Sequence, residues 1–371
     1  MSTVVSLAKC KDYEPERVAD AMAQCLEGLG EIDSVLTEGK RVLVKPNLLS
    51  PTAPEQGITT HPSLVQAVVN FARNKGCLVK VGDSHGGYER KTEEVWDKTG
   101  MKSVAEKTEA PLVNFEACGA HMRNINGREY PISNAVLDCD VLINLPRLKT
   151  HIITTLTGAV KNMFGCVPGF RKASYHRDLH SVRTFSEMLV DICQLVTPHI
   201  TIMDAIVSMD GNGPAAGRLR DSGLLLASLS PYALDAGIAT LVSAGERRIP
   251  TLGIARTRGL GPQGLKRVEF VGADPSECRI DRFKLPRGGE LPPILAAVVG
   301  RALWVRPRIN LAKCTSCGDC AENCPVKAIG MESKFPVIDL RRCVSCFCCQ
   351  EMCPSAAISP IRSRHLKLYQ R

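Results

Sequence analysis

The sequence has no hydrophobic run long enough to cross a membrane. A spanning helix needs roughly 20 consecutive apolar residues, whereas one of the longest runs in this chain covers only Ile294–Val299. The first ten residues also lack the apolar stretch of a secretory signal. We therefore expect no membrane span and no export, and we predict a cytoplasmic protein.

Motifs of several common enzyme classes are missing as well. The chain contains no Walker, H-E-x-x-H or G-x-S-x-G motif, so nothing favours phosphoryl transfer or hydrolysis. Residues 211–216 formally satisfy a dinucleotide-binding fingerprint. However, Pro214 has no amide to offer a pyrophosphate, and no helix is predicted after it. We interpret this segment as a substrate-site or structural loop.

Cysteine and charge are unevenly distributed. Nine of the 17 cysteines lie within residues 314–353 and the others are scattered, which indicates metal ligands in a reducing cytoplasm rather than disulfides. The net charge is +9, and residues 147–180 hold six Lys or Arg against one acidic residue. The basic tail, 359–371, lacks a series of interleaved aromatic side chains. We interpret it as solvated surface, and a nucleic-acid partner is not favoured.

Short β-branched runs alternate with helical patterns through residues 1–284. This alternation predicts an α/β domain with a large, mostly parallel sheet and helices on both faces. The expected strands are 4–7, 41–44, 78–81, 141–145, 200–203, 224–227 and 268–271. The expected helices are 14–29, 62–74, 184–196 and 231–242.

Two long loops and one linker interrupt this pattern. Residues 50–60 and 165–181 fit no regular element and are rich in polar side chains, which favours a functional role. Residues 285–307 are expected to form a linker followed by a short apolar helix at 294–304. A small domain is predicted at 308–358, followed by the tail.

The small domain carries a duplicated cysteine motif. Both copies follow C-x2-C-x2-C-x3-C-P, which is typical of bacterial ferredoxins with two 4Fe–4S clusters and an α+β fold. The first copy contains Cys314, Cys317, Cys320 and Cys324, and the second contains Cys343, Cys346, Cys349 and Cys353.

The fourth cysteine of each copy is expected to bind the other cluster. One cluster would then have Cys353 with the first three cysteines, and the other would have Cys324 with Cys343, Cys346 and Cys349. Two zinc sites are the alternative, but zinc motifs do not normally combine this spacing with the two prolines. Cys348 is out of register, and we interpret it as packed near a cluster rather than as a ligand.

Residues 3–275 resemble the domain of unknown function 362 family. The resemblance depends on the runs VKPNL (44–48), THP (60–62), GDS (82–84), NLPRLKTH (144–151), TGAVKNMFGCVPG (157–169) and DGNGP (210–214), with His176 downstream. Members of this family, many from anaerobes, often carry a C-terminal two-cluster ferredoxin. The resemblance therefore implies an oxygen-sensitive iron–sulfur protein but gives no substrate.

Polar residues follow several predicted strands. Because ligands bind at the carboxyl-terminal edge of open α/β sheets, we expect an anion-binding pocket at this edge, although each residue alone is also ordinary turn chemistry. A basic surface is the alternative reading. Gly86 and Gly87 would let backbone amides approach the anion. The candidate substrate-binding residues are Lys45, Asn47, Asp83, Asn144, Lys149, Lys161 and Asn162.

Four further residues are candidate proton donors. The spacing of His61, His151 and His176 matches no metal motif, so acid–base or hydrogen-bonding roles are favoured. Cys166 is either a nucleophile or proton donor, or a small core residue.

The sequence thus predicts an iron–sulfur oxidoreductase that delivers low-potential electrons to a small anionic substrate. The electrons would come from a ferredoxin, a flavodoxin or a reductase. The alternative is a non-enzymatic electron carrier or a metallocofactor-assembly factor that docks on a larger redox partner. A flavin or further metal, and the oligomeric state, stay open.

Overall fold

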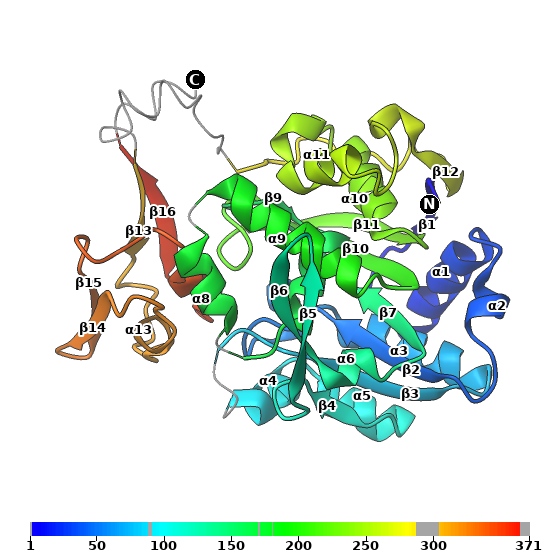
Figure 1. Ribbon diagram of the computed structural model, residues 1–371, viewed down its shortest axis with the longest axis horizontal. Helices are drawn as coiled ribbons and strands as arrows, with labels where there is room; N and C mark the ends of the chain where they lie inside the picture. Colours follow the sequence, from blue (N-terminus) through cyan, green and yellow to red (C-terminus); the bar gives the residue numbers. More distant parts are fainter. Residues whose placement is uncertain (1, 88–90, 170, 180, 287–303, 364–371) are drawn as a thin grey trace.

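The computed structural model describes residues 2–87, 91–169, 171–179, 181–286 and 304–363 (Figure 1). A large α/β domain, with helices on both faces of a mostly parallel sheet, carries a small α+β module on one side. The fold class predicted from the sequence is confirmed. None of the helices in the described ranges combines the length and apolar character that a membrane crossing requires.

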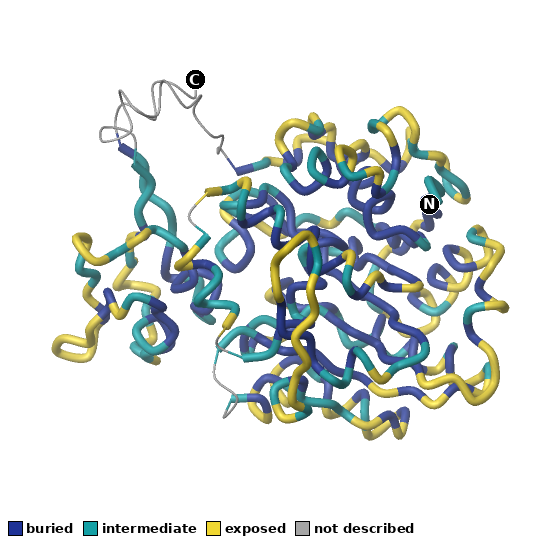
Figure 2. Tube along the Cα trace, viewed as in Figure 1, coloured by how far each residue is buried: buried dark blue, intermediate teal, exposed yellow. Residues whose placement is uncertain are grey.

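The large sheet has ten strands, eight of them in the order β12-β1-β11-β10-β7-β2-β3-β4, and β8 and β9 extend it beside β10. Antiparallel pairing is confined to β1–β11, β10–β11 and β8–β9. The strands are β1 (Val4–Lys9), β2 (Arg41–Pro46), β3 (Leu78–Asp83), β4 (Leu112–Asn114), β7 (Val141–Leu145), β8 (Arg147–His151), β9 (Thr155–Thr157), β10 (Ile200–Asp210), β11 (Arg218–Ser228) and β12 (Glu269–Gly272). A separate hairpin consists of β5 (Ala120–Ile125), which is largely exposed, and β6 (Arg128–Ser133), whose last four residues are buried (Figure 2).

Helices pack on both faces because successive strand residues point to opposite sides. In β2, Val42 and Val44 face the core beneath α1 and α3, whereas Leu43 faces the core beneath α9. The helices are α1 (Pro15–Glu27), α2 (Ile32–Val35), α3 (Pro62–Asn74), α4 (Thr92–Lys98), α5 (Met101–Thr108), α6 (Asn134–Leu137), α7 (Ala159–Asn162), α8 (Arg171–Asp178), α9 (Val182–Leu195), α10 (Pro231–Leu241) and α11 (Pro250–Thr257). Short 3₁₀ turns are η1 (Pro54–Gln56), η3 (Met163–Cys166), η4 (Glu246–Arg248) and η5 (Leu265–Arg267).

The small module contains β13 (Val305–Ile309), α13 (Asp319–Glu322), β14 (Ile329–Glu332), β15 (Phe335–Ile338), α14 (Cys348–Glu351) and β16 (Ile358–Arg362). β13 pairs with β16, so residues 359–362, which the sequence analysis placed in the tail, are part of a strand. Most of the expected linker, its helix and the rest of the tail lie outside the described residues.

Two regions differ from the sequence expectation. Lys149 and His151, which lie outside every strand expected from the sequence, are part of β8, which pairs in parallel with β10. The expected loop 165–181 contains the helix α8. Both segments are polar, and burial against neighbouring elements, which the residue pattern does not reveal, decides their conformation.

A buried ion pair fixes the start of β8 to β10. The Arg147 guanidinium lies 3.0 Å from the Asp204 carboxylate, and both side chains are almost fully buried. The hydroxyl of Tyr13 and the backbone amide of His61 also donate to Asp204. Arg147 donates further hydrogen bonds to the carbonyl of Val207. Each charge therefore has several partners, which offsets the cost of removing it from water.

Arg147→Met should lower the free energy of unfolding by about 3–5 kcal/mol, because it leaves the Asp204 carboxylate buried without its cation. Chemical denaturation measures this loss. The control is Arg17→Met, which removes an exposed ion pair with Asp12 and should change stability little. A loss no larger than that of the control would contradict the prediction.

Candidate functional site

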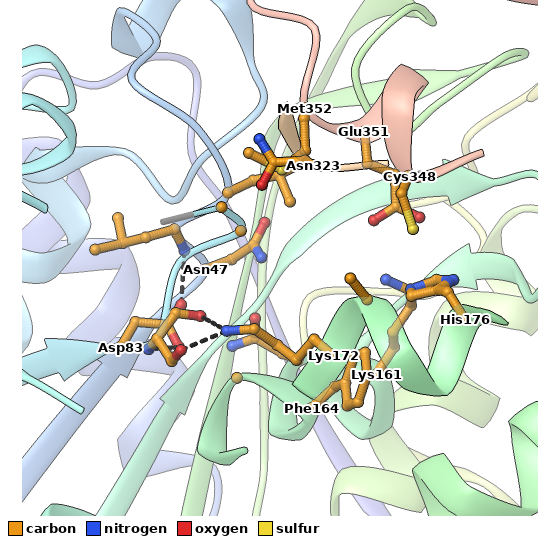
Figure 3. A pocket seen from close by; sticks show the side chains of 18 of the residues that line it. Asn47, Asp83, Lys161, Phe164, Lys172, His176, Asn323, Cys348, Glu351 and Met352 are labelled. Carbon is orange, nitrogen blue, oxygen red and sulfur yellow. Dashed lines mark hydrogen bonds between the residues drawn. The ribbon is translucent and has the colours of Figure 1, made fainter. Parts of the chain in front are cut away.

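A cavity lies where the carboxyl-terminal ends of β2 and β3 face the small module (Figure 3). Its empty volume is about 740 Å³, part of which opens to solvent. The large domain contributes one wall, with Asn47, Asp83, Ser84, Lys161, Asn162, Phe164, Lys172 and His176. The module contributes the opposite wall, with Asn323, Cys348, Glu351 and Met352.

A pair of glycines allows the two walls to approach. A Cβ on Gly86 would lie 2.5 Å from the sulfur of Met352, and one on Gly87 would lie 3.2 Å from its terminal methyl carbon. The Gly86 amide donates to the carbonyl of Leu49. These glycines therefore make room for the module. Both also line the cavity, and the expected approach of their backbone to an anion stays a prediction.

The floor beside Asp83 is a second buried ion pair. The ammonium of Lys45 lies 2.7 Å from the Asp83 carboxylate, with 0% and 2% of the two side chains exposed. Asp83 also accepts hydrogen bonds from the amides of Leu48 and Ser84. A Cβ on Gly165 would lie 2.2 Å from this carboxylate, so glycine is needed where the chain crosses the pair. Lys45 thus lies beneath the cavity, and Asp83 lines it.

Lys149 is also buried beneath the cavity. Its ammonium donates to the Asn47 side-chain oxygen at 2.7 Å and to the carbonyl of Ile58. Burial, with repulsion from Lys161 and Arg147, holds the pKa of Lys149 well below its usual range. Lys149 therefore orients Asn47, which lines the cavity.

Two carboxamides connect β7 with α7. Asn144 donates to the carbonyl of Ala159 and accepts a hydrogen bond from Asn162 at 2.7 Å. Asn144 is fully buried, and Asn162 lines the cavity.

Two lysines of the cavity wall carry its positive charge. Lys172 donates to the carbonyls of Ser84 and His85, and burial lowers the pKa of Lys172 to about 8. The Lys161 ammonium, by contrast, makes no hydrogen bond or ion pair among the described residues, although Glu351 attracts it. Lys161 is therefore the cation that is available to a ligand.

His151 contacts the module directly. Its Nδ1 accepts hydrogen bonds from the amides of Ile153 and Thr154, so Nε2 carries the hydrogen and donates to Glu351 at 2.6 Å. Burial lowers the pKa of His151 to about 4. Burial alone would raise the pKa of Glu351, but Lys161 and His151 outweigh it and hold that pKa below its usual range. The pair is thus a neutral imidazole donating to a carboxylate.

His176 is the candidate proton donor that lines the cavity. Its ring packs against Phe185 at 4.5 Å, and burial lowers its pKa to about 4. Its Nδ1 is buried and has no hydrogen-bond partner within the described part of the chain. A bound ligand would supply the missing partner.

The other two candidate proton donors lie elsewhere. His61 caps α3 by accepting a hydrogen bond from the Ser63 amide, and its ring stacks on Tyr13 at 3.7 Å. Cys166 is fully buried in the core beside Lys45, and burial raises the pKa of its thiol to about 12.

The sequence analysis did not select Lys172 or Glu351. Lys172 lies in the segment 165–181, for which the sequence predicted a functional role, so its position could have been used to select it. Glu351 lies between two cluster cysteines, Cys349 and Cys353, but only the docked module reveals that it points toward His151.

The cysteines of the module gather in the two crossed groups expected from the motif. Cys314, Cys317, Cys320 and Cys353 line one small cavity. In the other group, burial raises the pKa of the Cys343 thiol, and Cys346 and Cys324 lie close enough to raise that pKa further. Four thiols around one space fit the ligand set of a 4Fe–4S cluster.

The fold and the cysteine groups define an iron–sulfur electron-transfer protein with two 4Fe–4S clusters and an attached α/β domain. A model of the 4Fe-4S dicluster domain matches residues 306–354. The model described as Domain of unknown function (DUF362) matches residues 42–240, and the chain belongs to this family.

Relatives and solved structures add the following similarities. A thylakoid-associated protein of Synechocystis is 34% identical over 283 residues, which are 76% of this chain and 87% of that protein. The lactate racemase apoprotein of Thermoanaerobacterium thermosaccharolyticum is 12% identical with a TM-score of 0.44, over 65% of this chain and 57% of that chain. A Thermotoga maritima protein is 14% identical with a TM-score of 0.36, over 54% and 52%. At these TM-scores, the two structural similarities carry no argument about function.

Protein purified without oxygen should contain about eight irons and eight sulfides. Cys353→Ala should damage the cluster of Cys314, Cys317 and Cys320, and not the cluster of the nearer cysteines. Metal analysis and electron paramagnetic resonance measure this. Cys348→Ala is the matched control and should keep both clusters. About four irons, or two zincs, would overturn the ligand assignment.

The buried histidines should make the protein less stable in acid. His61, His151 and His176 each have a pKa near 4 in the folded protein, against about 6.5 when unfolded. Between these values only the unfolded chain binds the proton, so stability is lost as pH falls from about 6.5 to 4. Asp235, whose pKa burial raises to about 7, acts in the opposite direction but is a single group.

His61→Asn keeps a capping side chain without a titrating group, so it should flatten this pH dependence in urea unfolding curves. His121→Asn, at an exposed position, is the control. An unchanged slope in His61→Asn would show that His61 does not contribute.

Proposed function

We propose that this protein is an iron–sulfur reductase. A small anionic substrate, such as a carboxylate, phosphate ester or thioester, would bind in the cavity between the α/β domain and the module. The clusters would supply low-potential electrons one at a time. The position of the cavity carries the proposal, because Cys348 of its wall lies between the cluster cysteines Cys346 and Cys349 in sequence.

The charges of the cavity support an anionic substrate. Lys45 neutralises Asp83, which leaves Lys161 and Lys172 opposite the single carboxylate of Glu351. The wall therefore has an excess of positive charge. Asn47 and Asn162 add hydrogen-bonding groups, while Lys149 and Asn144 hold these two side chains from beneath.

Reduction of the substrate by two electrons requires two protons. We assign His176 to proton transfer, because it is the histidine of the cavity wall. Burial keeps its imidazole neutral in the free protein, and the negative charge of a bound anion would raise its pKa and allow it to carry a proton. His151 would act on Glu351 rather than on the substrate.

The alternative function is an electron carrier or an assembly factor without a substrate. A carrier needs no ligand-sized cavity beside its clusters, so the cavity supports the enzyme. We further propose a cytoplasmic location without oxygen, and a ferredoxin, flavodoxin or reductase as the source of electrons.

Anions that bind in the cavity should raise the melting temperature of the protein. An anion present at 100 times its dissociation constant stabilises the folded protein by about 2.7 kcal/mol. Lys161→Gln should weaken binding by roughly 1.5–3 kcal/mol, since it removes a charged donor. The control is Lys107→Gln on the exposed side of α5. Thermal-shift assays with acetate, phosphate and thioesters measure the effect. No shift with any of these anions would contradict the anion site.

A true substrate should also reoxidise the reduced clusters. After stoichiometric reduction, addition of a binding anion should restore the visible absorbance, and His176→Gln should slow this recovery by at least about 10²-fold without weakening anion binding equally. If none of the anions that bind restores the absorbance, the carrier function is favoured instead.

A further inference from the structure

A second hollow lies on the other side of His176 from the cavity. It runs between α9, α11 and the second cysteine run of the module, and His176 borders both spaces. Its empty volume, with the solvent that it opens to, is about 2140 Å³, nearly three times that of the cavity. This groove is much larger than the small anion of the proposed function requires.

The groove is positively charged. It is lined by Arg183, Arg247, Arg248 and Arg258, against the single carboxylate of Glu187.

Two of these arginines keep their charge uncompensated. Arg183 is paired with Glu187, and Arg258 is paired with Asp191 below the surface. Within the described residues, Arg248 donates to the carbonyl of Pro286 and has no ion pair, and Arg247 has no ion pair either. Both Arg247 and Arg248 are exposed on η4.

The module side of the groove is apolar and contains a cluster cysteine. Cys346 lies in the groove wall between Val344 and Phe347. Val344 is 40% exposed and offers apolar surface next to Cys346, whereas Phe347 is only 5% exposed. Electrons can therefore enter here close to a cluster ligand, without passing through the substrate cavity.

We infer that this groove is the docking site for an acidic one-electron carrier protein of the ferredoxin class. The inference rests on the proposed function, because it names the donor of the electrons. An apolar centre flanked by unpaired arginines is complementary to an acidic carrier, and such charge steering speeds the formation of small, transient complexes. In each encounter the carrier loses one electron and the module gains it.

The test compares a double variant, Arg247→Glu with Arg248→Glu, against wild type. The control, Lys266→Glu with Arg267→Glu, makes the same change in net charge on η5, beside β12 and far from the module (Figure 1). The probe is an acidic ferredoxin with one 2Fe–2S cluster, whose visible spectrum differs from that of the 4Fe–4S clusters of the protein. Binding is measured at low and high salt. Reduction of the protein is monitored through the loss of its visible absorbance, and dithionite is used in parallel as a small reductant that needs no docking site.

The groove variant should bind the ferredoxin roughly tenfold more weakly at low salt, show a flatter salt dependence and accept electrons from the ferredoxin correspondingly more slowly. The control should resemble wild type, and dithionite should reduce all three proteins at equal rates. None of these readouts uses the anionic substrate, so they stand even if the proposed function fails.

Three results would overturn the inference. One is unchanged ferredoxin binding in the groove variant. If this variant instead loses affinity for pyrophosphate, the groove is a site for small polyanions. Another is an equal loss in the control, which would mean that net charge alone matters. The third is a wild-type dimer that the groove variant dissociates, which would make the groove a self-association surface.

Discussion

The docking of α14 against the carboxyl-terminal edge of the sheet is the interaction on which the candidate site depends. The His151–Glu351 hydrogen bond, the Gln350–Asn212 hydrogen bond and the contact of Met352 with Gly86 hold the helix there. Without this contact, Asn47 and Lys161 would line an open edge of the sheet. With it, they line a cavity whose opposite wall belongs to the cluster-binding module.

Buried charge beneath the cavity is the cost of this arrangement. Three cationic side chains there are almost fully buried, and each has a compensating partner. Lys45 pairs with Asp83, Arg147 pairs with Asp204, and Lys149 donates to the Asn47 and Ile58 oxygens. Removing one partner of such a pair strands a charge away from water. The edge of the sheet is therefore rigidly specified, and Lys161, which has no such partner in the described residues, is left available for a ligand.

The sequence allowed the two clusters and the polar residues at the strand ends to be predicted, but not the direction of each side chain. The cysteine spacing is specific because a cube accepts few ligand geometries. The strand ends at Lys45 and Asp83 followed from apolar runs of the right length. Whether Lys45 points into the cavity or beneath it depends on where Gly165 crosses the sheet, and a contact between residues 120 positions apart leaves no local pattern. Glu351 could not be placed for the same reason, since its partner is on the other domain.

His176 lies at the point where the substrate cavity and the docking groove meet. Its Nδ1 is buried without a partner in the described structure, a state that costs roughly 1–3 kcal/mol. A ligand that hydrogen-bonds to this atom removes the cost. An anion that accepts or donates a hydrogen bond at Nδ1 would therefore bind more tightly. The same imidazole packs against Phe164 and Phe185, which fix its orientation. In the proposed reductase, protons and electrons would therefore approach the substrate from one side of the cavity, where α8 meets the second cysteine run.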